Sequence, residues 1–413
     1  MTARGSLGFS AAAVALVATL IANYVVSQFL RNSIGVIAPN LAQELLLTPA
    51  QIGLLSSMFF FPFAAIQIPL GMALDRFGPR ICLSVGAAVT VLGCIAFASA
   101  ASTQGLIAGR ALMGLGAAGA LVGALTVYAR RFPAHRFATL TGLQVGVGTV
   151  GALIATAPLG FSAATMGWRG SFLAVAAFAF VVGCLIVVVL RKDGAHYGRP
   201  ESVRESLAGT VAVLRTPSIG RLFAMSLVVY STFGLVTGLW GGPYLAHVYG
   251  YGLERRGSFL FVSVIGQIVG SLAWGPIDRL VGSYKLPVLI GAVATAASLG
   301  YLALVGTLPP TELALWFAIF GFVSAFGPLA IGHAKSLCAP HQVGRGLTVF
   351  NMGTMGGTFL TQAISGFVIE LFPATADGSY ELAAYRAVFA LQAGLIILVC
   401  LVYFGSRDPL KKS

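Results

Sequence analysis

Apolar stretches of about twenty residues alternate with short polar stretches along almost the whole chain. A helix needs about 20 predominantly apolar residues to cross the hydrocarbon core of a bilayer. By that criterion the pattern predicts twelve membrane-spanning helices, and therefore an all-α membrane protein. The expected ranges are 9–37, 51–74, 81–101, 105–129, 138–163, 168–190, 221–246, 256–277, 286–306, 312–334, 346–371 and 383–405.

The composition also indicates that lipid is the solvent of this chain. Of the 413 residues, 57% are hydrophobic and 9% are charged, and the mean hydropathy is +0.91. Soluble domains carry about 25% charged residues, because their surfaces face water. The five cysteines are scattered, mostly inside apolar runs, and are interpreted as small buried hydrophobes. We therefore expect no metal site and no cofactor.

The net charge of +13 would suggest a nucleic-acid partner in a soluble protein. Here the positions of the basic residues explain it. Most of the 25 Lys and Arg residues fall in loops and helix ends on one side, if the N-terminus is cytoplasmic. Basic residues concentrate in cytoplasmic loops. The sequence thus predicts a multi-pass protein of the inner (plasma) membrane with both termini in the cytoplasm and no nucleic-acid partner.

The two halves of the chain resemble each other. Asp75-Arg76 follows the second predicted helix and Asp278-Arg279 the eighth, while GWRGSF at the sixth is echoed by AYRAVF at the twelfth. Such echoes indicate a duplicated six-helix unit. Transporters with repeats of this kind bind their solute between the halves, which rock against each other. The expected units are an N-terminal bundle over 1–190, a cytoplasmic linker over 191–220 and a C-terminal bundle over 221–413.

The stretch GMALDRFGPR, Gly71 to Arg80, resembles the loop signature G-x-x-x-D-R-x-G-x-R of the major facilitator superfamily. GPIDRLVGSYK, from Gly275 to Lys285, is similar to a degraded second copy, and GRALMGLGAAGA resembles the family's second motif. The resemblance implies two pseudo-symmetric six-helix bundles and a monomeric secondary transporter without enzyme activity. It also implies gating or coupling roles for Gly71, Asp75, Arg76, Arg80, Arg110, Asp278 and Arg279.

Physical reasons support the gating residues. Gly71 would allow neighbouring helices to approach closely. Asp75 can cap a helix N-terminus and pair with a nearby Arg. Such contacts would hold the cytoplasmic ends of the halves together in one state and break in the other. Arg110, expected near the outer surface at the start of the fourth helix, is interpreted either as a structural pair or as a coupling residue.

Charges inside the membrane are the most informative signal for a substrate site. No carboxylate falls in the middle of a predicted helix, but Arg31 lies inside the first. We expect Arg31 to face a central cavity as an anion anchor; packing against carbonyls and snorkelling to the headgroups are the alternatives. Tyr24 and Gln28 share its helix face at i, i+4, i+7 spacing. The predicted site also contains Asn32, Gln144, Tyr230, Trp240, Tyr244, Gln267 and Asn351, and helix 11 also offers Gln362.

These features predict transport of a small polar metabolite, an organic anion or zwitterion such as a carboxylate, an amino acid or an acidic vitamin. The run SQFLRNSIGVIAPNL, Ser27 to Leu41, is similar to organic-anion members of the superfamily, and IQIPLGMALDRFGPR to amino-acid and organic-acid uptake members. A co-transported proton is left open. The alternatives are an efflux pump for a neutral or amphipathic compound, and a non-transporting membrane sensor or enzyme.

Overall fold

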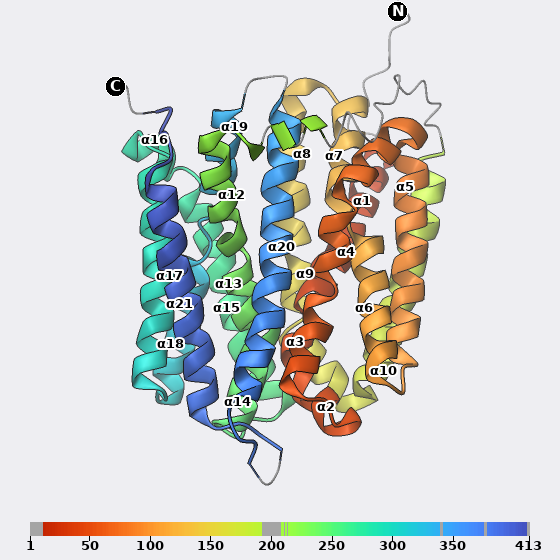
Figure 1. Cartoon of the computed structure of the whole chain (residues 1–413). Coiled ribbons are helices and arrows are strands. Elements are labelled where there is room, and N and C mark those ends of the chain that lie inside the picture. Colours follow the sequence, from red (N-terminus) through yellow and green to blue (C-terminus); the bar gives the residue numbers. More distant parts are fainter. Residues whose placement is uncertain are drawn as a thin grey trace, which may run out of the picture.

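The computed structural model describes residues 11–191, 208–209, 211–212, 214–338, 342–375 and 378–410. In these residues the chain is mostly helical, and most helices run along one common direction (Figure 1). Helix α1 begins and α21 ends at one end of the molecule, which we term the near end. Helix α2 ends and α21 begins at the opposite end, the far end.

Ten stretches of the described chain are long and apolar enough to cross a membrane. They are Ala11–Asn32, Gln67–Ala98, Thr103–Arg131, His135–Ile154, Ala157–Val189, Ser218–His247, Leu253–Trp274, Lys285–Val305, Pro310–Leu337 and Leu382–Phe404. The shorter apolar stretch Pro49–Ala65 and the 28-residue helix α20 supply two further crossings. The expected all-α membrane fold with twelve crossings is thereby confirmed.

The N-terminal bundle is built from ten helices as the structure divides them. They are α1 (Ala11–Asn32), α2 (Ile34–Leu45), α3 (Pro49–Ser57), α4 (Phe60–Ala65), α5 (Gln67–Ala98), α6 (Thr103–Ala117), α7 (Ala120–Arg131), α8 (Ala134–Gly148), α9 (Val150–Ile154) and α10 (Ala157–Val189).

The described part of the C-terminal bundle comprises nine α-helices and a π-helical turn, besides the short α16. They are α12 (Pro217–Val229), α13 (Ser231–Leu235), η1 (Val236–Trp240), α14 (Gly241–His247), α15 (Leu253–Trp274), α16 (Ile277–Val281), α17 (Lys285–Val305), α18 (Pro310–Val323), α19 (Gly327–Leu337), α20 (Val343–Glu370) and α21 (Leu382–Phe404).

Several predicted spans are interrupted or extended. The first breaks at Ser33 and continues as α2 to Leu45, beyond the expected end at 37. The seventh consists of α12, α13, η1 and α14. Apolar periodicity cannot reveal such breaks, because the hydropathy of the flanking residues does not change across them. Of the predicted linker, 192–207, 210 and 213 lie outside the described residues, and α12 already begins at Pro217.

The duplicated sequence signals occupy matching places in the two bundles. Gly78 and Gly282, the glycines of the two loop motifs, have φ values of 79° and 64°, a backbone region that glycine adopts readily. The echoed arginines bind carbonyls at helix ends. Arg169 donates to Ala100 O at 2.9 Å, after the third crossing, and Arg386 to Ala303 O and Leu304 O at the end of the ninth.

The bundles pack tightly against each other toward the far end. A methyl group on Gly35 of α2 would clash with the carbonyl oxygen of Thr237 in η1. Added to Gly53 of α3, it would lie 2.6 Å from Gln362 O of α20. At Gly257 of α15 it would lie 2.8 Å from the Cα of Ala157 in α10. Glycine thus brings three pairs of helices into backbone contact, one from each bundle. We call this the far-end seam.

Candidate functional site

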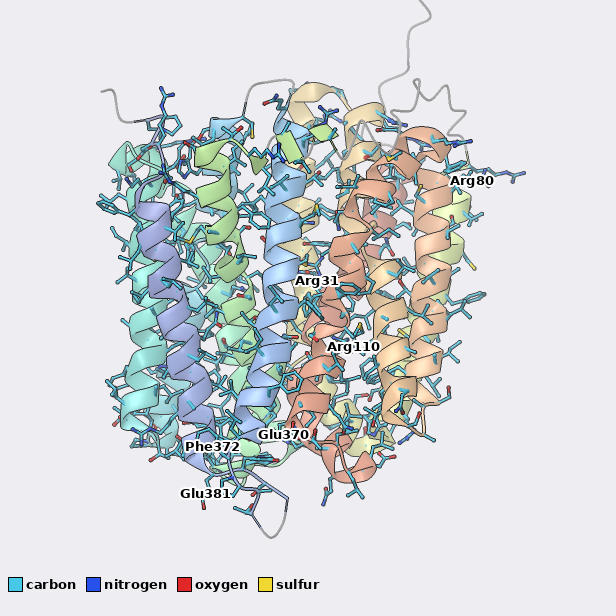
Figure 2. All side chains as sticks on the ribbon, in the orientation of Figure 1. Arg31, Arg80, Arg110, Glu370, Phe372 and Glu381 are labelled. Atoms are coloured by element: carbon cyan, nitrogen blue, oxygen red, sulfur yellow. The ribbon has the colours of Figure 1, made fainter. Side chains whose placement is uncertain are left out.

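Arg31 lies between the two ends of the molecule, in the last turn of α1 (Figure 2). Its side chain is buried, with 8% exposed, and its guanidinium carbon lies 4.6 Å from the ring centre of Phe63. Among the described residues, Nε has no hydrogen-bond acceptor and no carboxylate forms an ion pair with Arg31. Because α2 continues the span to Leu45, the guanidinium is too far from the far end to snorkel there.

Two tyrosines lie within electrostatic reach of Arg31. They are Tyr24, two turns earlier on the same face of α1, and Tyr230 of the C-terminal bundle. The Tyr24 ring packs on Gly148 of α8. The Tyr230 hydroxyl donates a long hydrogen bond of 3.4 Å to Asn32 Oδ1. Arg31 therefore stands at the boundary between the bundles, near groups from both of them.

Amide side chains complete this boundary. Asn32 Nδ2 donates to the carbonyl of Gln28 at 2.9 Å, and the buried Oε1 of Gln28 has no partner in the described chain. From the other bundle, Gln362 Nε2 donates to Gly234 O at 2.9 Å, and its own Oε1 is also buried without a partner there. The polar side chains at this boundary are therefore those of Tyr24, Gln28, Arg31, Asn32, Tyr230 and Gln362.

Other residues of the predicted site form contacts within the packed interior. Gln144 accepts a hydrogen bond from Tyr128 at 2.6 Å and donates to Leu20 O at 3.0 Å. Trp240 Nε1 donates to Ser365 at 2.7 Å, and the Tyr244 hydroxyl to Gly306 O at 2.8 Å. Gln267 and Asn351 are half-buried. Residue type alone cannot separate such interhelical clasps from ligand-facing groups, because both need a polar side chain in an apolar span.

Arg110 lies deep in the N-terminal bundle (Figure 2), not near the outer surface as expected. The guanidinium donates to Leu30 O at 2.7 Å and to Ser56 O at 3.4 Å, and lies 5.0 Å from the Phe59 ring centre. Both carbonyls precede breaks in the helices, at Ser33 and Met58. Arg110 thus binds the end of α1 next to Arg31 and the end of α3.

The motif loop lies at the near end. Asp75 Oδ1 is 3.8 Å from Arg130 Nη2 of the same bundle, and the two side chains are 73% and 41% exposed. Around Gly71 a methyl group would meet nothing within 4 Å, so the close helix approach expected there is absent in this conformation. Arg76 covers its neighbour Phe77, and Arg80 projects at the near end (Figure 2).

The second motif copy is arranged differently. Asp278 is half-buried and its Oδ1 has no hydrogen-bond partner among the described atoms, while Arg279 is exposed. The N-terminus of the following helix, α17, is instead capped by Asp408, which accepts from Ser283 Oγ and from the N–H groups of Tyr284 and Lys285. Burial raises the pKa of Asp408, but these donors outweigh it and hold the pKa below its usual range.

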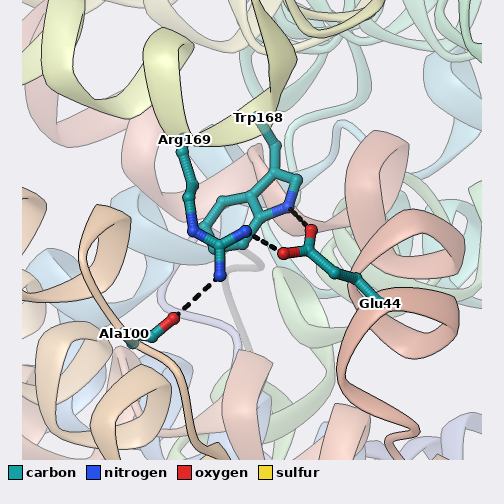
Figure 3. A network of polar contacts seen from close by, with 4 residues as sticks. All are labelled: Glu44, Ala100, Trp168 and Arg169. Carbon is teal, nitrogen blue, oxygen red and sulfur yellow. Dashed lines mark hydrogen bonds and ion pairs between the residues drawn. The ribbon is translucent and has the colours of Figure 1, made fainter.

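A polar network that sequence reasoning missed ties the far end of the N-terminal bundle together (Figure 3). Glu44 of α2 accepts from Trp168 Nε1 at 2.6 Å and forms an ion pair with Arg169, which also binds Ala100 O. The Trp168 hydrogen bond and Arg169 lower the pKa of Glu44 against a smaller effect of burial. The GWRGSF motif was the available signal, but it did not indicate the partner.

A further buried arginine joins the bundles at the far end. Arg256 at the start of α15 is 4% exposed and donates to Asn40 Oδ1 of α2 at 3.0 Å. This bond crosses the boundary between the bundles close to the Gly257 contact of the seam. No role for Arg256 followed from the sequence.

Comparisons with known proteins agree with this architecture. The sequence model described as "Major Facilitator Superfamily" matches residues 20–266 and 242–413. The chain is 24% identical to the "Probable sulfoacetate transporter SauU" of Cupriavidus necator (87% of this chain, 86% of that protein) and 23% to the hexuronate transporter of Bacillus subtilis (87% and 88%). It is 26% identical to the membrane sensor protein UhpC of Salmonella typhimurium (95% and 91%). The nucleoside transporter NupG superposes with a TM-score of 0.77 at 15% identity, over 95% of this chain and 99% of NupG.

Proposed function

Because this chain belongs to the major facilitator superfamily, we propose that it is a secondary transporter of a small organic anion or zwitterion that binds at Arg31. The family and the transporters among its relatives indicate a non-enzymatic membrane protein. The observation that carries the proposal is the buried guanidinium of Arg31, which has no acidic partner in the described chain and lies where the two bundles meet.

The energetics favour an anion. An uncompensated charge within a bilayer costs several kcal/mol, so intramembrane arginines usually have a functional partner. A carboxylate fits the planar guanidinium with two parallel hydrogen bonds, which strengthen where water is excluded. The relatives named for sulfoacetate and hexuronate transport act on organic anions, which supports the same class here.

We further propose alternating access between the ends. In this conformation the seam joins the bundles at the far end, so a solute would reach Arg31 from the near end. The basic loops favour a cytoplasmic near end, with both termini there. Rocking of the bundles would open the seam and bring together the near-end residues Gly71, Asp75, Arg76, Arg80, Asp278 and Arg279. We propose a proton as the co-transported ion, because an anion that enters with a proton carries no net charge.

The second candidate is a non-transporting sensor, favoured by the 26% identity to UhpC over 95% of the chain. A sensor and a transporter would share the anion site and differ in turnover. Uptake of radiolabelled solute into proteoliposomes separates them, because a sensor would bind the solute without accumulating it.

The test of the anion site is a thermal-shift screen of the purified protein against carboxylates, sulfonates and amino acids, since a ligand of the folded state raises its stability. Arg31→Ala should abolish the stabilisation, and Arg31→Lys should restore it poorly because Lys lacks the two-pronged geometry. Arg255→Ala is the matched control, since it removes an exposed arginine that covers Tyr251. Full ligand response in Arg31→Ala would refute the proposal.

A further inference from the structure

Two amide oxygens at the boundary between the bundles lack hydrogen-bond donors. Gln28 Oε1 and Gln362 Oε1 are both buried and unpartnered in the described chain. The Gln362 amide is oriented by its own Nε2, which donates to Gly234 O, so its oxygen is the free acceptor. Buried acceptors without donors are rare and unfavourable, and each needs an explanation. A ligand that donates hydrogen bonds would satisfy both.

Both amides lie in the neighbourhood of Arg31. Gln28 precedes Arg31 by three residues and therefore shares its helix face. A Cβ on Gly238 would lie 3.7 Å from Asn32 Oδ1 and 3.8 Å from Gln362 Nε2, so Gln362 faces the residue next to Arg31 across Gly238. Gly238 is the middle residue of the π-helical turn η1, a geometry frequent at functional sites.

We infer that the transported anion is a hydroxy acid, a small carboxylate that carries hydroxyl groups close to the carboxylate. This inference rests on the proposed function, since the carboxylate is placed on Arg31. The hydroxyl groups then donate to Gln28 Oε1 and Gln362 Oε1. The ligand thereby supplies an acceptor for Arg31 and donors for the oxygens of Gln28 and Gln362.

Other anions leave some of these three polar groups without a partner. A plain carboxylate or sulfonate would neutralise Arg31 but leave both amide oxygens without donors. The ammonium of an amino acid would donate, but in the described spans no carboxylate lies beside Arg31 to compensate its charge. Burying an uncompensated charge costs more free energy than burying a hydroxyl group. A site built to bind a substrate hydroxyl rejects the analogue that lacks it. We expect a roughly ten-fold loss of affinity for each hydroxyl removed.

The inference is tested by thermal-shift titrations of the purified full chain with glycerate, lactate and propionate, which carry two, one and no hydroxyl groups. Threonate and butanoate form a larger pair, and alanine replaces a hydroxyl by an ammonium. Affinity should fall by roughly ten-fold at each step from glycerate to propionate. Gln28→Leu should lower the affinity for glycerate roughly ten-fold and leave the affinity for propionate unchanged, since it removes only an acceptor of a hydroxyl group.

Gln144→Leu is the matched control. Its amide is fully bonded to Tyr128 and Leu20, so the variant should melt at a lower temperature but keep the glycerate-to-propionate ratio of the wild type. Equal affinities along the series, still abolished by Arg31→Ala, would overturn the hydroxy-acid inference and leave the anion proposal standing. Tighter binding of alanine than of lactate would overturn it too. Carboxylate binding that survives Arg31→Ala, or none at all, would overturn both.

Discussion

The two ends of the boundary between the bundles differ in how they are held. At the far end, backbone meets backbone at Gly35, Gly53 and Gly257, and Arg256 bonds across to Asn40. At the near end, Asp75 pairs within its own bundle, and a methyl group at Gly71 would meet nothing within 4 Å. In this conformation close backbone packing therefore joins the bundles at the far end, whereas the charged pair at the near end stays within one bundle.

Helix α8 packs against its own bundle by one face only. In its last turns Gln144 and Gly148 are buried against α1, while Leu143, Val145 and Val147 are exposed. Helix α10, by contrast, is in backbone contact with α15 of the other bundle at the far end. A tightly packed seam tolerates no added atom, whereas exposed charged contacts can form and break at little cost. We therefore expect an added side-chain atom to disturb closure of the far end, and the loss of a charge to disturb closure of the near end.

The largest effect should come from Gly35→Ala in the far-end seam. Overpacking costs about 1–3 kcal/mol, which shifts a two-state equilibrium roughly 5- to 150-fold toward the state with the seam open. Transport should fall accordingly, and a cysteine in place of Thr237 should become reactive to an impermeant maleimide from the far side. Gly146→Ala is the control, because nothing lies within 4 Å of its Cβ position. Equal loss of transport in both variants would contradict the contrast.

Asp75→Asn should have a smaller effect, of a few-fold on transport. The exposed pair with Arg130 contributes at most about 1 kcal/mol, so the melting temperature should barely change. Turnover in proteoliposomes should fall, because the near end loses a charge that we expect to act when it closes. Asp278→Asn in the degraded copy should reduce turnover less. Unchanged turnover in Asp75→Asn would count against charge as the closing element.

The smallest effect is predicted for Glu44→Gln in the far-end network. The lowered pKa means that the carboxylate contributes stability above the ordinary Glu range and loses it as the pH falls through the folded-state value. Because Glu44 is partly exposed, the melting temperatures should differ by no more than about 2 °C at pH 7. That difference should shrink below the ordinary pKa of Glu and vanish once the pH lies below the lowered pKa of the folded state. A difference that grows on acidification would have the wrong sign.

Much of the fold follows from the sequence, because apolar length reflects each crossing of the bilayer and the duplicated motifs reflect the repeated six-helix unit. The breaks were not predictable in this way. Ser33 interrupts the first span without a change in hydropathy, and Arg110, expected near the surface, is buried because its guanidinium reaches Leu30 O and Ser56 O. Those partners are tertiary contacts, which spacing along the chain does not reveal.

The residue types of the candidate site were predictable from the sequence, but which of their polar atoms are free to bind a ligand was not. Helical spacing alone placed Tyr24 and Gln28 on the face of Arg31. It could not separate Gln362, whose oxygen is free, from Gln144, whose amide is fully bonded, because the difference depends on tertiary partners such as Tyr128. Trp240 and Tyr244 illustrate the same limit, since their polar atoms bind within their own bundle.

The paired arginine caps also bear on how the protein is made. Arg169 reaches the end of the third crossing from the start of the sixth, and Arg386 does the same from the twelfth to the ninth. During synthesis the carbonyl of Ala100 has no such partner until the fourth and fifth crossings and the start of the sixth have left the ribosome. Each bundle therefore closes on its own last helix, and the N-terminal one can be complete in the translocon's vicinity before the C-terminal one is inserted.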